Sequence, residues 1–317
     1  MPCTYTHYIF AKDVLKACNS DVKNRITSNE KTFYVFGQSF DITFFKSYSF
    51  GHYAHTHNSN MYFANIVKYI RDNYLYNNSQ VMAYLYGSIC HYVLDTIVHP
   101  YVFYKTGNFY YKSKKTKKYK GHHNYLEYMI DAIIYEERTN KKIYKANLSR
   151  VVLPKIKFSQ ELSNTIDYAC LNAFERNNAS KLFRIGLKNF RFIVSHGFQS
   201  RFGIKYFIYK ILDKINFSKK RKLSNMCYYI KKMDYSVLNV EHKKWNYPVD
   251  KKTCFHYSFY DLYDVAVERA RYLINNLDNV IDKDGKKVKK ALKEIGNLSY
   301  TTGKSVDNKS TMKYFEY

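Results

Sequence analysis

The sequence has few residues that interrupt helices. It contains only four prolines and eleven glycines among 317 residues, and apolar residues recur at roughly helical spacing over long stretches. It shows no strong hairpin signal and no internal repeat, which argues against a sheet-based or repeat architecture. We therefore expect an all-α fold.

Closely spaced cysteines and long apolar runs are also missing. The six cysteines are scattered, without a CxxC pair, so we expect reduced and mostly buried thiols rather than a disulfide framework. The N-terminus lacks the pattern of a signal peptide, and no stretch reaches the ~18 to 20 apolar residues that span a bilayer. These absences predict a cytoplasmic protein.

Acidic residues are scarce relative to basic ones. The chain has 26 Asp and Glu against 52 Lys and Arg, a net charge of +26, and its pI is near 9.6. Such a balance favours a phosphate-rich partner, such as nucleic acid or an anionic membrane surface. A codon-biased genome would give the same composition, so the charge alone leaves both explanations open.

The chain is long enough for one large domain, and 46% of its residues are hydrophobic. No linker divides it, so we expect one α-helical domain over 1–280, followed by a basic helix and a loosely ordered tail over 281–317. Between two expected helices lies a basic loop. It is either a solvated linker or an anion-binding loop with these lysines: Lys112, Lys114, Lys115, Lys117 and Lys118.

One apolar segment carries three groups that are expensive to bury. His91, Asp95 and His99 are each four residues apart, so on a helix they lie within an arc of about 80° on one face. Burying them without partners would cost several kcal/mol each, whereas a metal ion would satisfy all three. Pro100 follows directly, which predicts that the helix ends at His99.

Further histidines and carboxylates surround this motif in the first 131 residues. The same spacing of four recurs at His123, Glu127 and Asp131, while Asp41 and a histidine cluster containing His55 lie upstream. Histidine and carboxylate ligands without cysteine are typical of catalytic zinc or a similar ion. The alternative is a buried network in which carboxylates alone satisfy the histidines.

The order of these motifs resembles the zinc-dependent phospholipase C family, which is related to the fungal single-strand nucleases. The resemblance covers about the first 130 residues and comprises Thr6-His7, Asp41, His55, H-x3-D-x3-H at 91–99 and H-x3-E at 123–127. It implies a multi-helix bundle whose facing helices hold two or three zinc ions. It also implies an enzyme that uses metal-bound hydroxide to cleave a phospholipid head-group phosphodiester.

The resemblance assigns the ligands to individual ions. The expected sets are Asp41, His55, His91 and Asp95 for one ion, His99, His123 and Glu127 for a second, and His7 with a bridging Asp95 for a third. Asp41 would orient or deprotonate the attacking water, and Asp131 would be a hydrogen-bond partner of a histidine ligand. Secreted relatives complete the third site with an N-terminal Trp; here the Pro2 amine is the candidate replacement.

Two other functions stay open at this point. One is a single-strand nuclease of the same superfamily, and the other is a non-catalytic module that binds metal or nucleic acid. We expect a phospholipid or another phosphodiester as substrate, with peripheral contact to an anionic membrane surface and nucleic acid as the second choice. The sequence does not indicate the oligomeric state.

Overall fold

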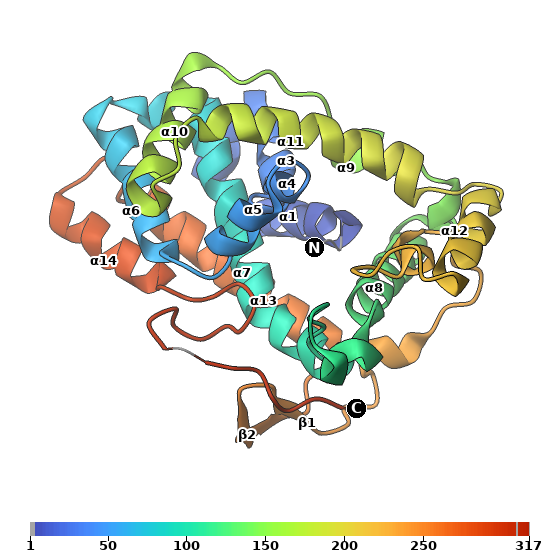
Figure 1. Cartoon of the computed structure of the whole chain (residues 1–317). Coiled ribbons are helices and arrows are strands. Elements are labelled where there is room, and N and C mark those ends of the chain that lie inside the picture. The colour runs from blue at the N-terminus through green and yellow to red at the C-terminus, as the bar shows by residue number, and fades with distance from the viewer. Residues whose placement is uncertain (1–3, 309, 317) are drawn as a thin grey trace.

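The architecture is helical. The computed structural model describes residues 4–308 and 310–316, and within them the elements are almost all helices (Figure 1). This confirms the predicted all-α class. The candidate N-terminal ligand, Pro2, lies outside the described residues.

The first part of the chain carries the central helix and the short helices around it. In order, these are α1 (Thr4–Ala17), α2 (Ser20–Ile26), α3 (Glu30–Phe36), α4 (Asp41–Phe44), α5 (Tyr48–Ala54), α6 (Ser59–Asp72) and α7 (Ser79–Thr106).

The rest of the chain wraps around these elements. Its helices are α8 (His122–Thr139), α9 (Leu148–Val152), α10 (Gln160–Phe174), α11 (Ala179–Ile193), α12 (Ile204–Lys214), α13 (Phe259–Asp278) and α14 (Gly285–Ile295). One antiparallel hairpin, β1 (Trp245–Tyr247) with β2 (Asp250–Phe255), lies at the edge of the molecule (Figure 1). The sequence carried no clear signal for it.

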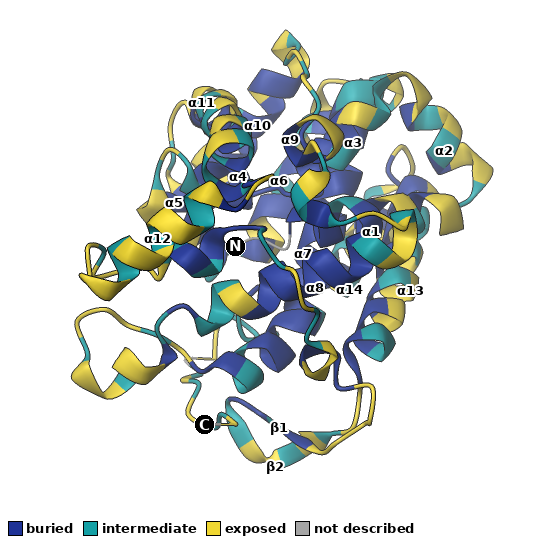
Figure 2. Cartoon of the chain, turned by 90° about the vertical axis from the view of Figure 1, so that its right-hand side faces the viewer, coloured by how far each residue is buried: buried dark blue, intermediate teal, exposed yellow. Residues whose placement is uncertain are grey.

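Helix α7 is the core of the fold. It packs against α1, α3 and α13, and nearly all of its side chains are buried (Figure 2). By length and composition α7 could also cross a membrane, which the sequence analysis did not foresee, but 94% of its apolar window is buried inside the protein. Burial by neighbouring helices is the usual situation of a core helix.

The close approach of α3 to α7 depends on Gly87. A Cβ atom at Gly87 would lie 2.5 Å from the carbonyl oxygen of Phe33, so a larger residue would push α3 away. Because Asp41 opens α4 shortly after α3, this contact fixes where the Asp41 carboxylate enters the interior.

The end of α7 differs from the prediction. The helix continues through Pro100 to Thr106, so the prediction that it ends at His99 is wrong. Pro100 has no N–H and cannot bond to the carbonyl of Thr96, which stands four residues earlier. Gly303, whose φ is +65°, packs directly against that carbonyl, since a Cβ atom at Gly303 would lie 2.4 Å from it.

The C-terminal segment returns to the core beside Gly303. Tyr300 is fully buried, and its backbone N–H donates to the carbonyl of His55 over 2.9 Å. Burial of this large aromatic ring holds the segment against the core, and the loosely ordered tail stays a prediction. The domain boundary at residue 280 stays a prediction.

Candidate metal centre

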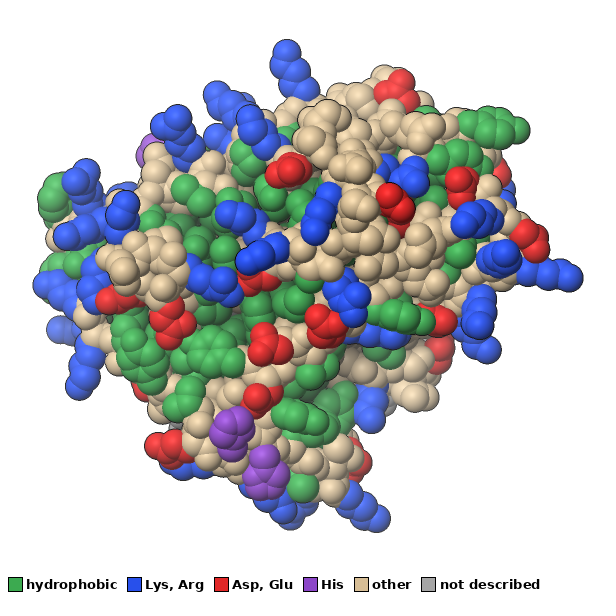
Figure 3. Space-filling view, turned by 180° about the vertical axis from the view of Figure 1, so that it is seen from behind, with side chains coloured by type: hydrophobic (Ala, Val, Ile, Leu, Met, Phe, Trp, Pro, Cys, Tyr) green, Lys and Arg blue, Asp and Glu red, His purple; other side chains and the backbone are tan. Residues whose placement is uncertain are grey.

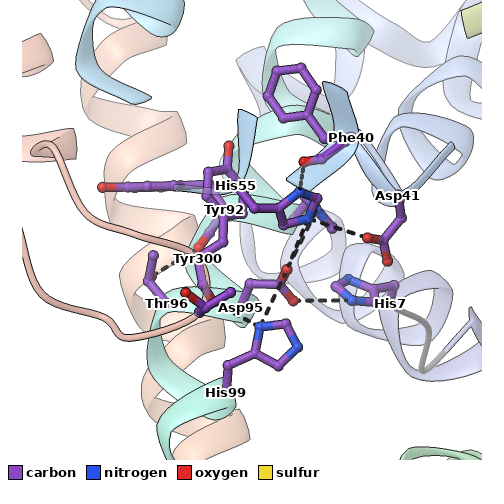
Figure 4. A network of polar contacts seen from close by, with 12 residues as sticks. His7, Phe40, Asp41, His55, Tyr92, Asp95, Thr96, His99 and Tyr300 are labelled. Atoms are coloured by element: carbon purple, nitrogen blue, oxygen red, sulfur yellow. Dashed lines mark hydrogen bonds and ion pairs between the residues drawn. The ribbon is translucent and has the colours of Figure 1, made fainter. Parts of the chain in front are cut away.

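Helix α7 presents its three polar groups on one buried face. His91 is 0% exposed, Asp95 3% and His99 7%, and Figure 4 shows the Asp95 carboxylate among imidazoles that come from several elements. The spacing of four residues along α7 brings the three side chains to a common side, as the sequence predicted.

Helix α1 supplies His7, and a buried carboxylate holds the start of that helix. Asp131 accepts hydrogen bonds from the N–H of Tyr5 (3.0 Å), and from the N–H (2.8 Å) and hydroxyl (2.6 Å) of Thr6. Tyr228 donates a further hydrogen bond of 2.6 Å. Asp131 thus binds the free N–H groups at the N-terminus of α1 and places His7 through the backbone.

This arrangement corrects the role that we expected for Asp131. Its hydrogen bonds go to the start of α1 and to Tyr228 rather than to a histidine ligand. Complete burial raises the pKa of Asp131 to about 6, while the hydrogen bonds from Thr6 and Tyr228 act in the opposite direction. Sequence spacing suggested one helix face but could not show which element packs against it.

Asp41 and His55 form a second part of the centre. Oδ1 of Asp41 lies 3.2 Å from Nε2 of His55, yet neither carboxylate oxygen of Asp41 has a hydrogen-bond donor. His55 directly follows α5, and its Nδ1 is 2.7 Å from the carbonyl oxygen of Gly51. A proton on Nδ1 would satisfy that carbonyl and leave the lone pair of Nε2 facing the interior.

Asp95 lies at the middle of the cluster. Its Oδ1 is 3.3 Å from Nε2 of His7. Its Oδ2 is 3.5 Å from Nε2 of His91, 3.6 Å from Nδ1 of His99 and 3.8 Å from Nε2 of His55. These separations exceed those of good hydrogen bonds, and Oδ2 has no hydrogen-bond partner. The four imidazoles therefore surround the Asp95 carboxylate at distances that leave Oδ2 unsatisfied.

The remaining ligand candidates gather at the start of α8. Oε1 of Glu127 is 3.0 Å from Nε2 of His123 and 3.5 Å from Nε2 of His99. Nδ1 of His99 lies 2.7 Å from the carbonyl oxygen of Tyr300, an outer hydrogen bond that orients the imidazole. The His123 side chain is 25% exposed, so it is the most exposed of the eight ligand candidates.

The eight predicted ligands thus fall into three groups whose ligand atoms lie within 4.8 Å of one another. The groups are His7, His91 and Asp95; Asp41, His55 and His91; and His99, His123 and Glu127. His91 belongs to two groups, whereas the resemblance placed it with one ion. Asp95 groups with His7, and its Oδ2 also lies 3.8 Å from Nε2 of His55 in the second group; its bridging of two ions stays a prediction.

Burial and charge give His91 and Glu127 the protonation states of ligands. Burial lowers the pKa of His91 to about 3, against the raising effect of Asp95 and Asp41, so its imidazole is neutral. Burial raises the pKa of the Glu127 carboxyl. Opposing effects, the largest of them from the His123 imidazole, outweigh burial and lower this pKa to about 2. Neutral imidazoles and ionised carboxylates are the forms that bind metal ions.

A cation fits this centre better than a network of hydrogen bonds. Both oxygens of Asp41 and Oδ2 of Asp95 are buried without a donor, and Nε2 of His91 faces Nε2 of His55 at 3.3 Å. Buried carboxylate oxygens without a partner are strongly destabilising. A cation between these atoms would satisfy all of them, and nitrogen and oxygen donors without sulfur suit zinc.

The five lysines of the predicted anion-binding loop are exposed. Lys118 lies over the ring of Tyr119, and Lys112 lies over the ring of Tyr111. Part of the loop forms a short 3-10 helix, Lys114–Tyr119, and the loop ends just before His123. Its role in binding an anion stays a prediction.

Tyr300 is a neighbour of the centre that the sequence did not indicate. Its ring centroid lies 4.9 Å from that of His55 and 5.4 Å from that of His91, and Figure 4 shows it beside the cluster. Tyr300 lies more than 200 residues after these histidines in a polar segment, and no spacing pattern connects it to them. Only the return of the C-terminal segment to α7 brings it there.

Comparison with known proteins agrees with the geometry. No curated protein and no solved structure matches the chain significantly. A family model described as zinc-dependent phospholipase C matches residues 6–174, a segment that includes every ligand candidate from His7 to Glu127. This match covers more than half of the chain, and the protein belongs to the zinc-dependent phospholipase C family.

Proposed function

We propose that the protein hydrolyses the head-group phosphodiester of a phospholipid, with two or three zinc ions held by the three ligand groups. The observation that carries this proposal is that both oxygens of Asp41 and Oδ2 of Asp95 are buried without a donor among facing imidazoles. Family membership supports the reaction class. Zinc bound here would supply Lewis acidity, lowering the pKa of water and neutralising phosphate oxygens.

The chain's own residues have separate tasks in this proposal. Asp41 has two buried oxygens without a donor, so it can accept a hydrogen bond from the attacking water and orient it. Asp131 keeps His7 in place through the start of α1. The Tyr300 carbonyl orients the His99 imidazole. Burial of most of the cluster excludes bulk water and strengthens its electrostatic interactions.

Substrate would reach the centre from the side of His123. This residue is the most exposed member of the third ligand group. Along the chain it follows the predicted anion-binding loop, residues 107–121, which we call the lysine loop. The exposed lysines can attract an anionic phosphodiester or an anionic bilayer, with roughly 1 kcal/mol for each lysine close to such a surface. The cytoplasmic location predicted from the sequence is part of this proposal.

Two measurements on the purified protein test the proposal. Elemental analysis should give two or three zinc ions per chain, and the zinc-loaded protein should release the phosphorylated head group from a soluble short-chain phospholipid. Single-stranded DNA is the competing substrate. Cleavage of DNA without head-group release would favour the nuclease, and zinc binding without either activity would favour a non-catalytic module.

A further inference from the structure

Helix α12 has its apolar face turned towards solvent. None of its residues is buried, and Figure 2 shows it as an exposed element at the edge of the molecule. The apolar side chains lie on one side of the helix and are between 49% and 67% exposed: Ile204, Phe207, Ile208, Ile211 and Ile215. A surface helix of a globular protein normally turns such a face to the core.

The opposite face attaches α12 to the protein through polar contacts. The hydroxyl of Tyr209 donates to the carbonyl of Gly197 over 3.1 Å. Asp213 accepts hydrogen bonds from the N–H groups of Leu223 (2.7 Å) and Ser224 (2.9 Å). These contacts hold the helix with its apolar side outward, so the exposure follows from how α12 is anchored.

Two further aromatic residues flank the helix. Phe202, just before α12, is 76% exposed, and Phe217, just after it, is 70% exposed. We call the side chains of Phe202, Phe217, the four apolar residues of α12 named above and Ile215 at its C-terminal end the α12 face. Contiguous exposed apolar side chains of this kind mark an interaction site.

The α12 face lies in strongly basic surroundings. Residues 201–222 contain eight Lys or Arg and one acidic residue, Asp213, whose carboxylate is engaged by backbone N–H groups. The edge of the molecule that carries α12 in Figure 1 lies on the left of Figure 3, where basic and hydrophobic side chains are mixed.

The lysine loop belongs to the same surface. Nζ of Lys120 donates to Asn216 (2.8 Å) and to the carbonyl of Ser218 (2.7 Å), and Nζ of Lys220 lies 4.9 Å from the ring centroid of Tyr111. Two basic segments that are about 100 residues apart in the sequence therefore form one continuous positive region around an apolar face.

The chemistry of this surface identifies its occupant. Isoleucine and phenylalanine side chains suit hydrocarbon, and a rim of Lys and Arg suits anionic head groups, the pattern of helices that lie in a membrane interface. A second copy of the chain would bring the same positive charges together and repel. Nucleic acid would use the lysines but would leave the aliphatic side chains exposed.

We propose that the α12 face is a membrane-docking element that enters the interface of an anionic lipid bilayer. Lys210 and Lys214 are exposed and lie towards one flank of the apolar face, so they can reach head groups while the apolar side chains enter the acyl boundary. Docking in this sense requires no hydrolysis.

Docking would also bring lipid to the opening of the metal centre, a consequence that rests on the proposed function. The segment after α12 contacts the residue that precedes α8, because the side-chain amide of Asn225 donates to the carbonyl of Gly121 over 3.0 Å. His123 stands two residues further along. A bilayer on the α12 face would therefore lie on the side of the protein where α8 begins.

The test is co-sedimentation of the full chain with vesicles. Wild-type protein should bind vesicles that contain phosphatidylserine and phosphatidylcholine, and should bind pure phosphatidylcholine vesicles at least tenfold more weakly. The double variant Phe207→Ser, Ile211→Ser should lose at least tenfold in binding to the anionic vesicles. The matched control is Val265→Ser, Tyr272→Ser, which removes apolar side chains that are 51% and 45% exposed on α13 and should bind like wild type.

Folding and activity are measured separately from docking. Zinc content and the thermal unfolding midpoint of both double variants should match wild type, and short-chain phospholipid hydrolysis by wild type tests the proposed function alone. Docking without hydrolysis would refute only the proposed function. The inference is overturned if the Phe207→Ser, Ile211→Ser variant binds anionic vesicles as wild type does. It is equally overturned if this variant keeps its vesicle binding and loses only self-association or binding to single-stranded DNA.

Discussion

The metal centre and the α12 face reverse the ordinary distribution of side chains in opposite ways. The centre buries carboxylates and imidazoles such as Asp41 and His91, whereas the α12 face exposes residues such as Phe207 and Ile211. Either arrangement costs stability when nothing binds there, because charge loses its hydration in the first case and apolar surface stays in water in the second. Local conflicts of this kind are expected at functional sites.

The two regions differ in what their partner must provide. The centre needs a small cation that reaches donor atoms within 4.8 Å of one another, and its geometry is fixed by rigid helices. The α12 face needs an extended apolar surface with negative charge and can tolerate an adjustable fit. Substitutions in the first region should therefore have larger and more position-specific effects than those in the second.

The largest effect is expected for Asp95→Asn. The amide removes the central negative charge while keeping the shape, so zinc content should fall and head-group release should decrease by about 10³-fold. Asp278→Asn is the control, since Asp278 is equally buried but bonds to Arg25 and Tyr86. It should lower thermal stability and keep zinc. Equal zinc content in both variants would contradict the assignment of Asp95.

A smaller effect is expected for Glu127→Gln. Glu127 contacts His99 and His123 of the third ligand group, so zinc affinity in that group should fall roughly 100-fold. Chelator titration should then show one weakened ion per chain and the others retained. Simultaneous loss of all ions would show that the three groups do not bind independently.

Asp131→Asn should change the pH dependence of stability. The pKa of Asp131 is raised by burial from 3.8 to about 6, so the folded state holds this proton more tightly than the unfolded chain does. The raised pKa adds on the order of 3 kcal/mol to the free energy of unfolding below pH 4. This stabilisation is lost as pH rises through 6. Urea unfolding between pH 4 and 7 should show a flatter profile in the variant than in wild type.

The smallest effect is expected for Tyr300→Phe. The hydroxyl of Tyr300 is buried without a hydrogen-bond partner, so its removal should change the free energy of unfolding by no more than about 1 kcal/mol. Tyr300→Ala also removes the ring beside His55 and should cost about 3 to 5 kcal/mol. Similar losses in the two variants by urea unfolding would mean that the hydroxyl has a role the structure does not show.

Part of the site could be predicted because its determinants are local. The spacing of His91, Asp95 and His99 depends only on helix geometry, and the helical class follows from composition and apolar periodicity. Asp131 shows the limit of such inference. Its position one turn after Glu127 suggested a partner for a histidine, but packing of α1 against α8 gave its oxygens to Tyr5 and Thr6.

The sequence by itself determined the helical fold class, the ligand types and the order of the ligands, since these depend on residue identity and on spacing of a few residues. Tertiary structure decided which ligands share a group, how Tyr300 reaches His99, and that α12 turns its apolar face outward. Those outcomes depend on contacts between segments far apart in the chain, such as Lys120 with Ser218, and helical periodicity specifies a face without specifying what will cover it.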